Sequence, residues 1–187
     1  LKLALAKAKA NNVPKDNIQR AIQKGAGAQD GSNFEEITYE GYGPAGVAVM
    51  VDALTDNRNR TAADVRHLFS KHGGNLGENG CVGWMFKRKG VFAIDGDAGY
   101  NEDDLMMLVL DAGAEDIKSE DGAFEIITKP EDFEAVEKVL AENNVAVMMS
   151  EISMIPDTIA ELSPEDAAKV ERLIDALEDL DDVQDVF

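Results

Sequence analysis

The chain has 187 residues, a net charge of −19, one Cys and 44% hydrophobic residues. These values predict a folded protein with sizeable cores and exclude an internal disulfide or a zinc site built from paired Cys clusters. No apolar run approaches the roughly 20 residues of a membrane helix, and no signal-peptide pattern is present. We therefore expect a cytoplasmic protein, and the sequence predicts neither a metal nor a cofactor.

The first 32 residues are predicted to form a helical domain, with Pro14 in a first turn and Gly25 as a stop. Six Lys and Arg against two Asp and Glu give this segment a charge of +4. The chain begins at Leu1 inside a helical pattern, so we expect that its natural N-terminus is missing. Residues 25–33 have the composition of a linker.

The next segment changes to the alternation of β-strands. Ile37–Glu40 and Val47–Val51 predict a hairpin. A helix is expected to follow, with Thr61 and Asp64 as its capping box and Gly73 as its stop. This segment opens an α+β domain.

A glycine-rich loop then leads to Cys81–Phe86, which we predict to be a strand. The loop lacks the Gly-Lys-Ser/Thr ending of a phosphate-binding P-loop. Trp84 and Phe86 are expected in the core. Base stacking by these rings is the alternative, but no neighbouring exposed aromatic pattern supports it.

Residues 90–150 have the strand and helix order of a ferredoxin-like βαββαβ domain. The predicted elements are strands Val91–Ile94, Asp116–Lys118, Ala123–Thr128 and Val145–Ser150, and helices Glu102–Ala112 and Pro130–Asn143. The tail adds a helix capped at Ser163 and a strand Val183–Phe187. Because this tail is too small to fold alone, we infer that residues 151–187 complete the domain of residues 33–89, with residues 90–150 inserted between them.

Charge is distributed unevenly along the chain. Thirteen Lys and Arg against nine Asp and Glu give residues 1–89 a charge of +4, whereas five against twenty-eight give residues 90–187 a charge of −23. Within residues 57–89, seven basic residues face only Asp64 and Glu78, a balance of +5. Such asymmetry indicates one surface suited to phosphate and another that repels it.

Phosphate recognition is the chemistry that the basic residues favour. Arg58 and Arg60 are predicted to precede a helix start, where backbone donors and the helix dipole attract an anion. A solvated basic face is the alternative. The candidate nucleic-acid contacts are Lys7, Lys9, Lys15, Arg20, Lys24, Arg58, Arg60, Arg66, Lys71, Lys87, Arg88 and Lys89.

Catalysis has few candidate groups. His67 and His72 are five residues apart, a spacing that turns them away from each other on a helix, and Cys81 lies beyond them. An enzyme using these three residues is one alternative, and a protein-interaction module acting through the acidic half is another. We expect His72 to close its helix, where the dipole favours a cationic ring.

Three long motifs resemble the YebC/PmpR family, which includes the mitochondrial translational activator of cytochrome c oxidase. They are Ala8–Ile18, Tyr39–Gly46, and the series Asp56–Thr61, His72–Gly77 and Trp84–Phe86. The resemblance covers essentially the whole chain. It implies an α+β protein of three domains: a helical N-terminal domain, a discontinuous α+β domain and an inserted ferredoxin-like domain.

The resemblance also implies a non-enzymatic role on nucleic acid. Members are described as cytoplasmic DNA-binding transcriptional regulators, and others as ribosome-associated translation factors acting on difficult stretches such as proline runs. The basic N-terminal arm of the family, with its Gly-His-Ser-Lys-Trp-type motif, is absent here, so weaker binding is expected. Expected partners are DNA or ribosomal RNA, and a basic protein on the acidic inserted domain. Phosphate contacts alone do not separate DNA from RNA.

Overall fold

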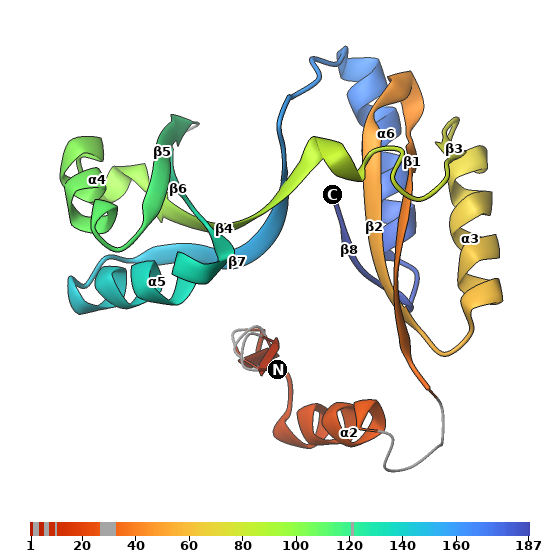
Figure 1. The fold of residues 1–187 in the computed structure, drawn as a ribbon, viewed down its shortest axis with the longest axis horizontal. Coiled ribbons are helices and arrows are strands. Elements are labelled where there is room, and N and C mark those ends of the chain that lie inside the picture. Colours follow the sequence, from red (N-terminus) through yellow and green to blue (C-terminus); the bar gives the residue numbers. More distant parts are fainter. Residues whose placement is uncertain (2–3, 6–7, 10, 27–32, 121) are drawn as a thin grey trace. The chain divides into compact units, whose positions relative to one another are not determined.

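The computed structural model describes every residue except 2–3, 6–7, 10, 27–32 and 121 (Figure 1). The chain divides into two compact units. Leu1–Met85 together with Thr158–Phe187 form the first, which we call the split unit, and Phe86–Asp157 form the inserted unit. Among the described residues, no helix has the length and apolar character needed to cross a membrane.

The split unit is built on a four-stranded antiparallel sheet in the order β3-β1-β2-β8. Its strands are β1 (Glu35–Tyr42), β2 (Ala48–Thr55), β3 (Asn75–Leu76) and β8 (Val183–Val186). The predicted hairpin joins β1 to β2 through the short 3-10 turn η1 (Pro44–Gly46). Because β8 pairs with β2, the end of the chain completes a sheet that begins with its first strand.

Two helices of the split unit pack on the same sheet. They are α3 (Arg58–Lys71) and α6 (Pro164–Glu178). Val65 and Phe69 from α3, and Leu173 and Leu177 from α6, are each fully buried against inward-facing residues of β1 and β2 such as Val51. Burial of these aliphatic and aromatic side chains is the main force that holds the two helices on the sheet.

Helix α2 (Lys15–Gly25) ends at the predicted Gly25, but Pro14 is its N-cap and does not lie in its first turn. None of its side chains is buried. The linker predicted at residues 25–33 lies largely outside the described residues.

The inserted unit has the predicted ferredoxin-like fold. Its elements are β4 (Phe86–Asp95), α4 (Glu102–Leu110), β5 (Ala114–Glu120), β6 (Ala123–Thr128), α5 (Phe133–Glu142) and β7 (Val147–Pro156), with short 3-10 turns η3 (Gly96–Ala98) and η4 (Pro130–Asp132). The strand order is β5-β6-β4-β7, and all neighbours are antiparallel. Strands β4 and β7 pair from Phe86 to Pro156, so the inserted unit extends beyond residues 90–150.

The core of the inserted unit contains the two phenylalanines of its central strands. Phe92 is fully buried and stacks on Phe133 with ring centroids 4.7 Å apart, and Phe124 is also buried. Gly90 permits this packing, because a Cβ there would lie 2.7 Å from the Phe133 ring. These aromatic rings therefore face the helices and do not form an RNA-binding sheet surface.

The structure corrects two local predictions. Helix α3 begins at Arg58, one turn before the predicted start, with Asn57 as its cap and Thr61 buried in its first turn. Of the predicted strand Cys81–Phe86, only Phe86 is in a strand, as the first residue of β4; the rest is a loop that ends in the 3-10 turn η2 (Gly83–Met85). Trp84 is 72% exposed there and does not belong to a core.

Candidate nucleic-acid interface

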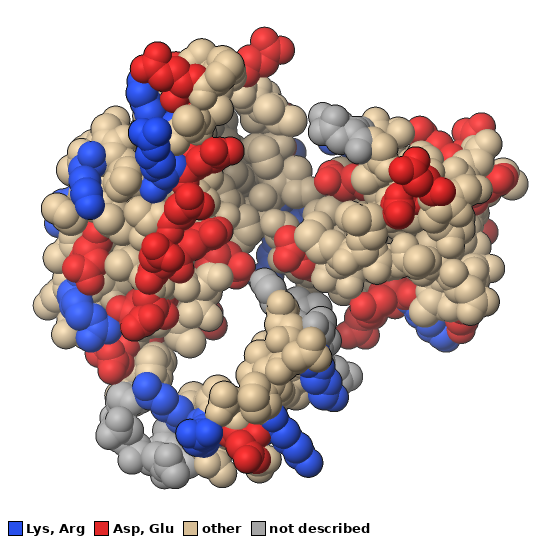
Figure 2. Space-filling model, turned by 180° about the vertical axis from the view of Figure 1, so that it is seen from behind, with Lys and Arg blue, Asp and Glu red and all other residues tan. Residues whose placement is uncertain are grey.

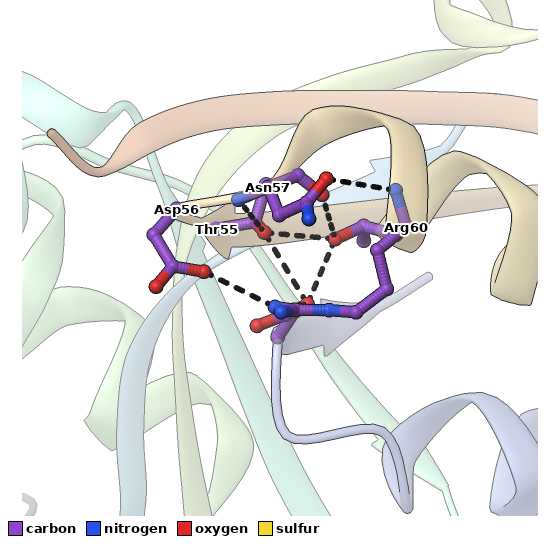
Figure 3. Close-up of polar contacts among 6 residues, drawn as sticks. Thr55, Asp56, Asn57 and Arg60 are labelled. Carbon is purple, nitrogen blue, oxygen red and sulfur yellow. Dashed lines mark hydrogen bonds and ion pairs between the residues drawn. The ribbon is translucent and has the colours of Figure 1, made fainter. Parts of the chain in front are cut away.

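The start of helix α3 is fixed by the side chains of two residues that precede it, Thr55 and Asn57 (Figure 3). The side chain of Asn57 accepts a hydrogen bond from the backbone N–H of Arg60 at 3.1 Å. The backbone N–H of Asn57 donates to the hydroxyl of Thr55 at 2.9 Å. An Asn cap satisfies one of the backbone donors that a helix leaves unpaired at its N-terminus. The sequence predicted that Arg58 and Arg60 precede the helix. They lie instead inside its first turn.

Arg60 is held by two carboxylates (Figure 3). Its guanidinium lies 2.8 Å from Asp182 and 3.2 Å from Asp56. The buried hydroxyl of Thr61 also donates to Asp182, at 2.8 Å. These contacts tie the first turn of α3 to the segment that enters β8.

The same contacts set the charges in this cluster. Burial opposes ionisation of Asp182, but hydrogen bonds from Arg60 and Thr61 outweigh it and lower the pKa of that carboxyl. The hydrogen bond to Asp182 raises the pKa of Arg60. The charge of Arg60 is therefore neutralised by carboxylates of the protein itself.

A groove beside this cluster is lined by acidic side chains. It has a volume of about 370 Å³, and Arg60 and Thr61 share its lining with Asp64 and residues 179–182. Three of the residues in that last range are aspartates. Because their charges repel phosphate, this side of α3 is not suited to nucleic acid.

The other basic residues of α3 are available to a ligand. Arg58, Arg66 and Lys71 are exposed, and within the described part of the chain none of them forms an ion pair. Four of the predicted contacts therefore lie on α3. Three of them are available to a ligand, and Arg60 is not, because it is ion-paired. Burial raises the pKa of the neighbouring Tyr39 hydroxyl, and the charge of Arg58 opposes that rise.

Helix α2 and the residues before it supply a second group of cations. Lys9, Lys15, Arg20 and Lys24 are all exposed, whereas Lys7 lies outside the described residues. The guanidinium of Arg20 bonds to the Asn17 side chain of its own helix at 2.7 Å, and the Lys24 ammonium lies 5.8 Å from the Phe34 ring centroid. Figure 2 shows Lys and Arg side chains gathered on this helix.

The basic triplet at the start of β4 is largely neutralised. Lys87 forms an ion pair with Asp157 at 2.9 Å, and Lys89 forms one with Glu115. Arg88 is exposed and has no ion pair among the described residues. Of the three, Arg88 is therefore the cation that is available to bind a ligand without breaking an ion pair between described residues.

The groups proposed for catalysis do not form a site. His67 is exposed, and His72 caps the C-terminus of α3 as predicted. Burial, followed by the charge of Glu40, raises the pKa of the Cys81 thiol, which disfavours the nucleophilic thiolate. In the part of the chain that the structure describes, no three His, Cys, Asp or Glu residues are grouped to hold a metal.

Sequence reasoning missed the residues around the glycine-rich loop. Glu40 is 6% exposed, and its carboxylate accepts hydrogen bonds from the backbone N–H groups of Gly80 and Gly83. A glutamate inside an alternating strand, followed by a loop rich in glycine, was the available signal. Because the loop is held to the sheet in this way, Trp84 is carried on its outer side.

Comparison with known proteins identifies close relatives. A family model described as "TACO1/YebC second and third domain" matches residues 34–187. A "Probable transcriptional regulatory protein" from Desulforamulus reducens is 55% identical over 188 residues, covering all of this chain and 78% of its own length. One of the same name from Clostridium tetani is 57% identical over 187 residues, covering all of this chain and 76% of its own length.

A solved structure supports the fold. The crystal structure of a conserved hypothetical protein from Aquifex aeolicus superposes with a TM-score of 0.84 and 45% sequence identity. The match covers the whole of this chain and 77% of the other. Likeness of this extent covers both units of the present fold.

Proposed function

Because this chain belongs to the TACO1/YebC family, we propose that it is a regulator of gene expression that binds nucleic acid without catalysing a reaction. DNA is the proposed target and transcription the proposed step, in a cytoplasmic setting. Relatives at 50–57% identity named as probable transcriptional regulatory proteins support this assignment.

The observation that carries the proposal is the set of unpaired cations on α3. Arg58, Arg66 and Lys71 project from one helix of the split unit and have no ion pair within the described residues. Long cationic side chains free of local carboxylates are what phosphate contact requires. Lys9, Lys15, Arg20 and Lys24 extend the proposed contacts to the N-terminal helices.

The inserted unit is assigned a different partner. Residues 90–150 carry sixteen Asp and Glu against three Lys and Arg, a charge of −13. Figure 2 shows the predominance of acidic side chains on this unit. Such a surface repels phosphate and attracts cationic protein surfaces. We therefore assign a basic protein partner to it.

Binding titrations across salt concentration test the proposal. The full chain is titrated with duplex DNA and with RNA from low to physiological salt. If phosphate contacts dominate, the logarithm of the association constant falls linearly with the logarithm of salt concentration. An affinity that does not change with salt, or no binding to either nucleic acid, would contradict the proposal.

A second measurement identifies the target in cells. Crosslinking followed by sequencing of the bound nucleic acid separates promoter DNA from ribosomal RNA. Recovery of ribosomal RNA would replace the transcriptional role by the alternative, a ribosome-associated translation factor.

A further inference from the structure

Two exposed aromatic side chains of the split unit are held by the same backbone carbonyl. The indole N–H of Trp84 donates to the carbonyl oxygen of Cys81 at 3.1 Å, and the hydroxyl of Tyr42 donates to the same oxygen at 3.3 Å. Trp84 is 72% exposed and Tyr42 is 37% exposed. We call these two residues the aromatic pair.

The loop that carries Trp84 is hydrogen-bonded to strand β1 through Glu40. The buried carboxylate of Glu40 accepts from the backbone N–H groups of Gly80 and Gly83. A Cβ at position 83 would meet the end of the Glu40 side chain, so a larger residue there would require the carboxylate to move. The hydrogen bonds of the loop and of the indole itself therefore set the position of Trp84 before any ligand arrives.

The aromatic pair is accessible to a ligand, Trp84 largely and Tyr42 in part. Both polar ends are satisfied by the Cys81 carbonyl, and neither ring stacks on another aromatic ring among the described residues. A ligand that covers these rings removes apolar surface from water, which favours binding. Fixed and accessible aromatic rings are what a stacking ligand requires.

The segment that follows helix α3 packs on the backbone of Tyr42. Gly74 packs so tightly on the backbone of Tyr42 that a Cβ there would lie 2.5 Å from the Tyr42 carbonyl oxygen. Exposed Lys71 ends helix α3 three residues earlier in the sequence. A nucleotide combines a flat base with a phosphate, so exposed aromatic rings and an exposed cation within one unit offer contacts to both.

We propose that the aromatic pair stacks on unpaired bases of a single-stranded nucleic acid. This inference rests on the proposed nucleic-acid function and narrows its target. Bases within a duplex are already stacked on one another, whereas the bases of single strands, loops and ends are free to stack on protein rings. Tyr42 and Trp84 are thus assigned the contacts with unpaired bases, and the cations of α3 the contacts with phosphate.

Intrinsic fluorescence provides a direct test, because Trp84 is the only Trp of the chain. The full chain is titrated with an unstructured oligouridylate RNA and with a DNA duplex of equal phosphate number. Stacking predicts that the RNA quenches Trp84 emission and that the duplex leaves it nearly unchanged. Equal quenching by both probes would overturn the inference.

Variants separate stacking from general attraction. Trp84→Ala and Tyr42→Ala should each weaken oligouridylate binding by about tenfold or more, the loss typical of one stacked base, and leave duplex binding and its salt dependence unchanged. Trp84→Phe should restore most of the affinity, because it keeps a ring. Met107→Ala, which removes a comparably exposed side chain from the inserted unit, is the control.

The remaining outcomes are also decisive. Unchanged oligouridylate affinity in Trp84→Ala, with wild-type binding intact, overturns the inference and leaves the proposed function standing. The exposed ring would then belong to a protein contact. Failure of the wild-type chain to bind either probe overturns both.

Discussion

Helix α3 and the start of strand β4 both carry clusters of basic side chains, but only α3 leaves most of them available. Among the residues that the structure describes, Arg60 is the one ion-paired cation of α3, whereas on β4 both Lys87 and Lys89 are paired. The sequence shows the reason for α3. Asp56 lies four residues before Arg60 and pairs with it, while no acid lies three or four residues from Arg66.

The comparison shows that the net charge of a segment is not its available charge. Residues 57–89 have a balance of +5, yet three of their seven basic side chains are neutralised by carboxylates within the protein. An ion-paired side chain must give up its partner before it can bind phosphate. We therefore expect affinity to follow the unpaired cations.

The largest effect is expected from charge reversal on the outer side of α3. Arg58→Glu with Arg66→Glu should weaken nucleic-acid binding by about 100-fold at low salt and reduce the salt slope by about 2, one for each lost phosphate contact. Titration across salt measures both quantities. Arg172→Glu is the matched control, because this exposed arginine lies on α6 among acidic side chains.

Arg60 is deliberately left unchanged in that variant. Reversing it would oppose Asp56 and Asp182 and destabilise the fold, so lost binding would have two causes. An unchanged circular dichroism spectrum with lost affinity confirms that the effect belongs to binding. Unchanged affinity would show that the phosphate contacts lie elsewhere.

The next effect concerns stability at the start of α3. Thr61→Val removes a buried hydroxyl that bonds to Thr55 and Asp182, each at 2.8 Å. Because a hydrogen bond to a charged carboxylate is among those lost, the free energy of unfolding should fall by about 1–3 kcal/mol. Urea unfolding followed by Trp84 emission reports on the split unit. Ser70→Ala, on the exposed face of the same helix, is the control.

Nucleic-acid affinity of the folded Thr61→Val protein should equal that of the wild type. The cluster around Arg60 would then contribute to stability, and the exposed cations of α3 to nucleic-acid binding, independently of each other. A loss of affinity in the folded variant would mean that the cluster itself contacts the ligand.

Most of the fold follows from sequence periodicity. The strand and helix order of the inserted unit was predicted correctly, and β6 occupies the predicted residues Ala123–Thr128. The start of α3 was wrong because Asn57 and Thr61 both fit a capping pattern. Thr61 is buried and bonds to Asp182, 121 residues away in the sequence, a contact that no local pattern reveals.

The candidate site was predictable only as a list of cations. Local spacing indicates the Arg60–Asp56 pair, but Asp182 is 122 residues from Arg60 and Glu115 is 26 residues from Lys89. Which charges are neutralised therefore depends on tertiary structure. Trp84 was misplaced for a similar reason, because its exposure follows from the anchoring of the loop by Glu40.

A smaller effect is expected from pH on Asp182. Its pKa in the folded state lies below the ordinary value, so its contribution to stability is complete above the unfolded pKa of about 3.9 and is lost as pH falls through the folded pKa. The difference in unfolding free energy between wild type and Asp182→Asn should be constant near neutral pH and narrow below about pH 4. Urea unfolding at a series of pH values measures it. A difference that grows on acidification would contradict the pairing with Arg60.

The smallest effect is expected at β4, where pairing and availability can be compared within three residues. Lys87→Gln with Lys89→Gln removes two charges that are already paired with Asp157 and Glu115. Partly exposed pairs of this kind contribute less than about 1 kcal/mol to stability, so the fold should be unaffected. Nucleic-acid affinity should fall less in this double variant than in Arg88→Gln, which removes one unpaired charge. If the double variant loses more, the ion pairs open on binding, and pairing in the free protein does not decide which cations reach phosphate.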